Sequence, residues 1–358
     1  MQAIRVHPSP STPYSPTNPA PSTCLHLDQN IPIPQPKKPG DLLIRLKATT
    51  IVRDMLTWPE TYAHDYAIIG NDLSGTVAEV FPPSDSSGSN SPFKPGDSVF
   101  GMAAADRGGA WAEYVLVKED EIALKPHALT FAQAAAVPLS AQTAYEALFV
   151  HGGIAVPALS EDSTTTTNKK TTSPQGEITT RVLITGAAGA VGIYLVQLAA
   201  AARGVHVVAA TSSNARNAEF LTGLGADQTV EYAELEGDGY RGAFDLVVDA
   251  VGGDVLAKCW GYVKGETSGG GGRLVSVDSA SYEFVEEHRA RGIAREGVKA
   301  LFFIVQGSRG ELHYLAEMAE RGALRAFVVG ESPFGEVREA YERANGRYLG
   351  HGKFVLTV

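Results

Sequence analysis

The stretch "RVLITGAAGAVGIYLVQLAAAARG", residues 181–204, places Gly186, Gly189 and Gly192 between a strand-like apolar run and a long apolar-periodic run. Glycines at a strand–helix turn let the backbone bend tightly and approach a ligand closely. The N-terminus of the following helix offers free N–H groups to an anion. The G-x-x-G-x-x-G spacing alone is a weak signal. Its place between a strand and a helix favours a dinucleotide pyrophosphate over a turn that serves only helix–strand packing.

Strands and helices alternate around this turn. The pattern predicts strands at 182–185, 205–211, 227–232, 244–251 and 273–278, with helices at 191–202 and 214–225. The apolar runs are nearly continuous, which is typical of strands covered on both faces. We therefore predict an α/β fold with a doubly wound parallel sheet of the Rossmann type.

The regions on either side of this sheet have a different character. Short strands are predicted at 41–52, 72–81 and 111–117, which indicates a β-rich first domain, and the helical segment 130–149 is broken at Pro138. The tail predicts helices at 310–322 and 334–346 and a last strand at 353–358. Residues 8–23 are rich in Pro, Ser and Thr and are expected to form a mobile loop, and residues 156–180 read as a polar, exposed insertion.

Composition narrows the class of protein. The chain has 358 residues, of which 44% are hydrophobic. Its net charge of −10 argues against nucleic acid or an anionic membrane as partner. The first residues do not read as a signal peptide, and no apolar run reaches the length of a membrane span, so we expect a soluble, cytoplasmic protein. The two cysteines, Cys24 and Cys259, favour a reducing compartment and cannot build a four-cysteine zinc lobe.

The end of the second predicted strand bears on the choice of dinucleotide. An acidic residue there would bind a ribose 2′-hydroxyl and repel a 2′-phosphate, but the segment "ATSSNARN" (210–217) contains none. Ser212 and Ser213 can donate hydrogen bonds, and Arg216 can pair with a phosphate. The segment favours NADPH over NADH, with an ordinary polar surface loop as the alternative.

Nine stretches, from "GDLLIRLKATT" through "IIGNDLSGTVAEV", "GGAWAEYVLV" and "FDLVVDAVGG" to "HGKFVLTV", span nearly the whole chain. On these stretches the chain resembles the zinc-independent branch of the medium-chain dehydrogenase/reductase superfamily, namely quinone oxidoreductase-like proteins and fungal enoyl reductases. The resemblance implies a GroES-like β-rich catalytic domain at 1–140 and 290–358 and a Rossmann domain at 141–289. It also implies a nicotinamide in the cleft between the domains and, often, a homodimer formed by edge strands.

The same resemblance implies roles for individual residues. Gly189, Ala190 and Val191 should line the pyrophosphate and the nicotinamide ribose, and Ser212, Arg216 and Tyr232 should surround the adenosine 2′-phosphate. The residues implied near the nicotinamide are Thr143, Val251, Gly252, Phe303 and Lys353.

The chain departs from its zinc-dependent relatives at the metal position. They have a Cys where this chain has Ile51 and a "GHE" motif where it has Gly70, Asn71 and Asp72. Because soft and imidazole ligands are missing, we expect no catalytic metal. Many quinone reductases also have a Tyr where this chain has Leu56.

Without a Lewis acid, an already activated acceptor is the easier substrate. We expect NADPH-dependent reduction of an apolar, conjugated small molecule, either an enone or enoyl C=C bond or a quinone, with the protein orienting the reactants. Tyr62 and Asp72 are candidate proton donors, with water as the alternative, and Trp58, Met102 and Phe303 are candidates for an apolar substrate wall. Two other readings stay open, namely NADPH binding without turnover and a biosynthetic cyclase or isomerase.

Overall fold

Residues 1–81, 91–159, 179–266, 271–346 and 348–358 are described by a computed structural model of the chain. The chain divides into two compact units. The first contains residues 1–142, 306–320 and 325–358, and the second contains 143–305 and 321–324. Residues 290–305, which the sequence analysis placed in the first domain, lie in the second unit because their strand joins its sheet. Most of the predicted insertion at 156–180 lies outside the described residues.

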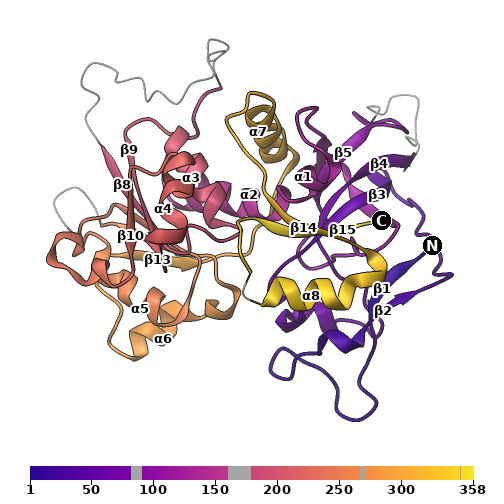
Figure 1. The fold of residues 1–358 in the computed structure, drawn as a ribbon, viewed down its shortest axis with the longest axis horizontal. Coiled ribbons are helices and arrows are strands. Elements are labelled where there is room, and N and C mark those ends of the chain that lie inside the picture. The colour runs from indigo at the N-terminus through magenta and orange to yellow at the C-terminus, as the bar shows by residue number, and fades with distance from the viewer. Residues whose placement is uncertain (82–90, 160–178, 267–270, 347) are drawn as a thin grey trace. The chain divides into compact units, whose positions relative to one another are not determined.

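The second unit is built on a parallel sheet of six described strands in the order β10-β9-β8-β11-β12-β13 (Figure 1). This confirms the predicted doubly wound class, with β8 leading through the glycine turn into α3. The strands are β8 (Thr180–Ile184), β9 (Val205–Thr211), β10 (Gln228–Glu231), β11 (Leu246–Asp249), β12 (Arg273–Ser276) and β13 (Lys299–Phe302). The helices are α3 (Gly192–Ala201), α4 (Asn214–Gly223), α5 (Gly253–Tyr262) and α6 (Phe284–Ala290), and a π-helical turn covers Glu146–His151.

Burial explains why this sheet forms. All four residues of β11 are buried, and β9 is buried at every position except His206. Strands covered on both faces favour continuous β-branched apolar runs such as those seen here. Helix α3 is buried from Gly192 to Ala199, so its apolar sequence fits a helix enclosed by its own unit.

A pair of buried aromatic side chains joins α5 to α6. The indole N–H of Trp260 donates a hydrogen bond to Nδ1 of His288 at 2.8 Å, and both side chains are almost fully buried. The hydrogen bond requires an unprotonated Nδ1. Burial, followed by the charge of Arg291, lowers the pKa of His288 below its usual value of 6.5.

This contact predicts a loss of stability in acid. Above about pH 6.5 His288 is neutral in both states, and below it the unfolded chain binds a proton that the folded state resists. The free energy of unfolding should therefore fall as the pH drops below about 6.5. Urea unfolding of the wild type and of His288→Phe measures the share due to this residue, since the variant lacks the titrating group. Equal pH slopes for the two proteins would contradict the assignment.

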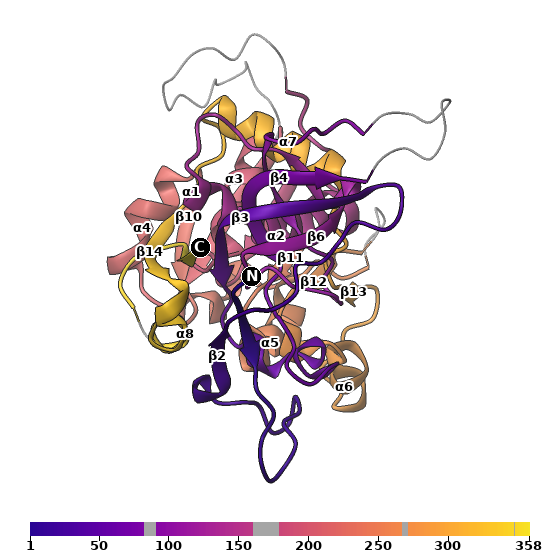
Figure 2. The same cartoon turned by 90° about the vertical axis from the view of Figure 1, so that its right-hand side faces the viewer.

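The first unit is dominated by an antiparallel sheet in the order β14-β15-β3-β4-β5-β7, with β6 paired to β3. Among the described strands of this sheet, β14 and β15 are the only parallel neighbours. Long β3 bonds to β15, β4 and β6, and Figure 2 shows it running beside β4 and β6. The strands are β3 (Asp41–Ile51), β4 (Asp72–Val80), β5 (Ser98–Met102), β6 (Tyr114–Lys118), β7 (Ile122–Leu124), β14 (Val328–Pro333) and β15 (Lys353–Thr357). The helices are α1 (Phe131–Ala135), α7 (Arg309–Glu320) and α8 (Val337–Asn345), and α2 (Pro138–Tyr145) leads into the second unit.

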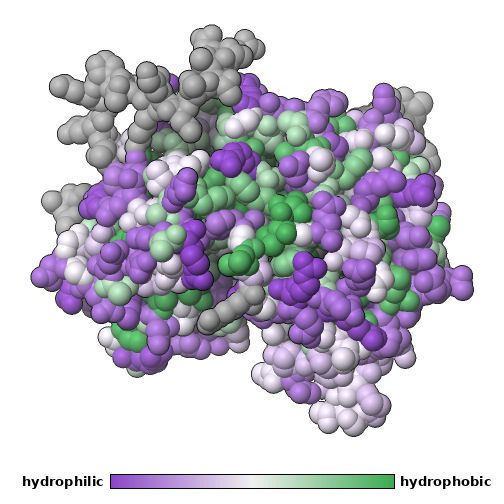
Figure 3. Space-filling view, viewed as in Figure 1, coloured by the Kyte–Doolittle hydropathy of each residue, from purple (hydrophilic) through white to green (hydrophobic). Residues whose placement is uncertain are grey.

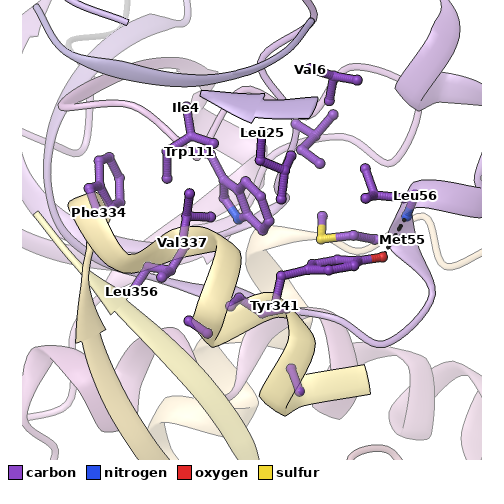
Figure 4. Close-up of a cluster of buried hydrophobic side chains, with 14 of the residues drawn as sticks. Ile4, Val6, Leu25, Met55, Leu56, Trp111, Phe334, Val337, Tyr341 and Leu356 are labelled. Carbon is purple, nitrogen blue, oxygen red and sulfur yellow. Dashed lines mark hydrogen bonds between the residues drawn. The ribbon is translucent and has the colours of Figure 1, made fainter. Parts of the chain in front are cut away.

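A hydrophobic cluster fastens the N-terminal hairpin, β1 (Ala3–Val6) with β2 (Leu25–Asp28), to this unit (Figure 4). Helix α8 buries Val337, Ala340, Tyr341 and Ala344 against the cluster, and the Tyr341 hydroxyl accepts a hydrogen bond from the Leu56 N–H. Hydrophilic side chains cover the outer side of α8 in Figure 3. The predicted loop 8–23 is held at its C-terminal end, where the Ala20 N–H donates to the Tyr62 hydroxyl at 2.8 Å.

None of the helices among the described residues is long and apolar enough to cross a membrane.

Candidate cofactor site and buried ion pair

The turn after β8 can be built only with glycine at two positions. Gly186 has φ +62°, and a Cβ there would lie 3.0 Å from the carbonyl oxygen of Ala250. A Cβ at Gly192 would lie 2.1 Å from the carbonyl oxygen of Gly186, a distance that real Cβ atoms essentially never show. The start of α3 therefore packs directly on the turn, so the glycines serve helix–strand packing as well as the tight bend that the sequence pattern predicted.

The outer part of the turn offers hydrogen-bond donors. Gly189 is exposed, and Ala190 and Val191 are partly exposed. Among the described residues, the backbone N–H groups of Ala190 and Val191 have no hydrogen-bond acceptor. Such groups at a helix N-terminus suit a phosphate oxygen. The turn thus fits a dinucleotide pyrophosphate on geometric as well as sequence grounds.

A buried carboxylate holds the strand ends next to the turn. Asp249, at the end of β11, accepts hydrogen bonds from the Thr185 hydroxyl at 2.6 Å, the Gly252 N–H at 2.9 Å and the Ser276 hydroxyl at 3.3 Å. Burial raises the pKa of the Asp249 carboxyl. Asp249 was not among the predicted site residues, although an acid at the end of a buried strand and before two glycines is a usable signal.

Tyr232 also contacts the glycine turn. Its hydroxyl accepts a hydrogen bond from the Gly186 N–H at 2.8 Å, and burial raises the pKa of this hydroxyl. The hydroxyl proton stays available for donation. The structure thus places this hydroxyl on the glycine turn itself. The predicted contact of Tyr232 with a 2′-phosphate stays a prediction.

The segment predicted to select the dinucleotide, residues 210–217, runs from the end of β9 into the first turn of α4. Ser213 is the N-cap residue of α4, and Ser212 and Arg216 are exposed. In the described part of the chain, the Arg216 guanidinium makes no hydrogen bond or ion pair. These side chains are therefore free to meet a ligand, and their role as phosphate ligands stays a prediction.

The other predicted cofactor residues of the second unit have varied surroundings. Val251 is 41% exposed. Gly252 has φ +77°, and a Cβ atom added there would collide with the Asp278 carboxylate. The half-buried ring of Phe303 lies 4.3 Å, centroid to centroid, from the ring of His151. Thr143 is buried at the start of this unit. The contacts of these four residues with a cofactor stay predictions.

In the first unit, the candidate catalytic residue Asp72 forms a buried ion pair with Lys353. The Lys353 ammonium lies 2.6 Å from Oδ2 of Asp72, and the two side chains are 3% and 0% exposed. The Thr50 hydroxyl donates to the same oxygen at 2.5 Å, and the Leu139 N–H donates to Oδ1 at 2.7 Å. Both carboxylate oxygens are thus occupied, and the predicted cofactor residue Lys353 is turned toward Asp72.

The residues around Asp72 do not fit a zinc ion. The neighbouring Asn71 amide donates to the backbone carbonyls of Ala103 and Ala104 at 3.2 and 3.1 Å. No group of three His, Cys, Asp or Glu side chains in the described residues is arranged to hold a metal. Zinc in proteins needs three or four such ligands. The positive charge beside Asp72 is the ammonium group of Lys353 and not a metal ligand set.

The structure does not bring the remaining candidates into one site. The Tyr62 hydroxyl donates to the Leu56 carbonyl and accepts from the Ala20 N–H, and burial raises its pKa. Trp58 packs against the cluster of Figure 4. Met102 lines a separate cavity of about 230 Å³ together with Gln142 and Gly307. A substrate wall that includes Trp58 and Met102, and proton donation by Tyr62, stay predictions.

Comparison with known proteins agrees with this architecture. The family model of the alcohol dehydrogenase GroES-like domain matches residues 38–127, and that of the zinc-binding dehydrogenases matches residues 224–356. The chain is 33% identical over 363 residues to a probable zinc-binding oxidoreductase, mitochondrial, of Arthroderma benhamiae, and the match covers 98% of each chain. It is 32% identical over 239 residues to the 2-methylene-furan-3-one reductase of Solanum lycopersicum, covering 64% of this chain and 54% of the relative.

A solved structure, the quinone oxidoreductase from Coxiella burnetii, is similar over 100% of this chain and 99% of its own, with a TM-score of 0.73 and 26% identity. A GroES-like region combined with a nicotinamide-dependent dehydrogenase fold defines an oxidoreductase. The chain belongs to the medium-chain dehydrogenase/reductase superfamily, which includes members of the quinone oxidoreductase type.

Proposed function

We propose that the protein is an NADPH-dependent reductase of conjugated acceptors, either an enone or enoyl C=C bond or a quinone, that works without a catalytic zinc ion. The observation that carries the proposal is the buried Asp72–Lys353 pair next to Asn71, the residue that stands where zinc-dependent relatives have the His of the GHE motif. Two relatives named for a 2-methylene-furan-3-one and for quinones support the choice of acceptor.

The chain's own groups account for binding and orientation. The N–H groups of Ala190 and Val191 and the positive end of α3 would hold the pyrophosphate. Ser212, Ser213 and Arg216 would receive the 2′-phosphate, which is the reason to prefer NADPH. When bound, the reduced nicotinamide supplies two electrons and one hydrogen to the acceptor. Orientation of the reactants and exclusion of water are the remaining tasks of the protein.

The second hydrogen arrives as a proton. The hydroxyl of Tyr62 already donates within the fold, and the Asp72 carboxylate accepts from three donors. We therefore propose water as the source of the single proton that the acceptor takes up beside the hydride, for a quinone as well as for an enone or enoyl acceptor.

The proposal is tested by following the 340 nm absorbance of NADPH with three kinds of acceptor. We expect it to fall with a conjugated enone or a quinone and to stay constant with a saturated ketone of similar size. Tight NADPH binding with no turnover of any acceptor would favour a binding or sensing role. Formation of a product without NADPH consumption would favour a cyclase or isomerase.

A further inference from the structure

The fold brings the acidic side chain of Glu231 to the start of α4, although residues 210–217 contain no acid. Glu231 is the last residue of β10 and pairs in register with Thr211, the last residue of β9. Its Oε1 accepts a hydrogen bond from the backbone N–H of Asn214, the first residue of α4, at 2.7 Å. The carboxylate therefore crosses from one strand end to the helix that follows the neighbouring strand.

This position matters for the choice of dinucleotide. In a doubly wound sheet the adenosine ribose binds beyond the end of the second strand, where an acid contacts the 2′-hydroxyl in NAD-specific proteins. Residues 210–217, at the end of β9 and the start of α4, contain no acid. The carboxylate of Glu231, at the end of β10, lies at this same end of α4. A second carboxylate, that of Glu234, accepts from the Glu231 N–H at 2.8 Å and adds negative charge nearby.

We propose that Glu231 is a specificity-determining residue that limits the preference for NADPH. This inference rests on the proposed function. Its carboxylate opposes a 2′-phosphate and offers an acceptor to a 2′-hydroxyl, so the site binds NADH as well as NADPH. Arg216 and Glu231 act in opposite directions, and the coenzyme preference is the balance between them.

Two further features agree with a hydroxyl ligand. The hydrogen bond to the Asn214 N–H uses Oε1 of Glu231, and within the described ranges no donor lies on Oε2. The side-chain oxygen of Asn214 is buried and lacks a hydrogen-bond partner among the described residues. Both atoms are acceptors, and an acceptor suits the O–H group of a ribose better than the oxygens of a phosphate.

The test is a fluorescence titration of the full-length protein with NADPH and with NADH, for the wild type and for Glu231→Gln. Glutamine keeps an oxygen for the Asn214 N–H but removes the charge. We expect the ratio of the NADH dissociation constant to the NADPH dissociation constant to rise about tenfold, which equals about 1.4 kcal/mol. Arg216→Ala should move the ratio in the opposite direction.

Glu219→Gln is the matched control, because it removes the same charge from an exposed position of α4 and should leave the ratio unchanged. An unchanged ratio in Glu231→Gln, or an equal loss of affinity for both dinucleotides, would overturn the inference and leave the proposed function intact. Failure of the wild type to bind either dinucleotide would overturn the proposed function and, with it, this inference.

Discussion

Replacing Lys353 with Met is expected to lower the free energy of unfolding by about 3–5 kcal/mol, because it leaves the Asp72 carboxylate buried without its partner. The two side chains are 3% and 0% exposed, so water cannot replace the lost ammonium without a rearrangement of the fold. Methionine keeps most of the aliphatic volume of lysine, so the change reports mainly on charge. Urea unfolding followed by circular dichroism measures the difference.

The double variant Lys353→Met with Asp72→Asn separates charge from packing. The asparagine oxygen can still accept from the Leu139 N–H, and its NH2 group can donate to the Thr50 hydroxyl, which accepts as well as donates. The double variant should therefore recover most of the lost stability. A cost of less than about 1 kcal/mol for Lys353→Met would resemble an exposed ion pair and would contradict the buried arrangement.

Gly192→Ala is expected to weaken NADPH binding by about 100-fold, or about 2.7 kcal/mol. The new methyl group would lie 2.1 Å from the Gly186 carbonyl oxygen and 2.7 Å from the Cα atom of Ala187. Backbone must move to relieve both contacts, which displaces the N–H groups that would hold the pyrophosphate. Overpacking of this kind also costs about 1–3 kcal/mol of stability. Fluorescence titration with NADPH and urea unfolding measure the two effects.

Gly223→Ala is the matched control, since it makes the same chemical change at the last residue of α4. Among the described residues, no atom outside its chain neighbours and the backbone of its own helix lies within 4 Å of the added Cβ. Alanine there should leave NADPH binding unchanged and raise stability by up to about 1 kcal/mol through helix propensity. Unchanged NADPH affinity in Gly192→Ala would show that the turn either tolerates the methyl group or does not contact the ligand.

The Rossmann-type sheet could be predicted because its signals are local. The apolar runs of β8, β9 and β11 are each continuous, and Gly186 and Gly192 mark the turn between β8 and α3. Strand β13 was not predicted, because its short segment shows little periodicity and is identified only by pairing with β12. Because of that pairing, residues 290–305 belong to the second unit and not to the first domain, for which they were predicted.

The candidate site was predictable only in part, because several of its contacts join residues far apart in the sequence. Asp72 and Lys353 are 281 positions apart, and no local pattern shows that their charges meet. Likewise, the absence of an acid after β9 suggested a site open to a 2′-phosphate, whereas sheet pairing brings Glu231 to α4. Pattern reading identifies the elements, while pairing between strands decides which side chains meet.

The most direct test of the account is turnover by metal-free protein. The protein is dialysed against a strong chelator, its zinc content is measured, and NADPH oxidation is followed with an enone and with a quinone. On this account we expect the same rate before and after chelation, with no gain on adding zinc, because Asp72 is already neutralised by Lys353. Loss of activity on chelation with recovery on adding zinc would contradict it.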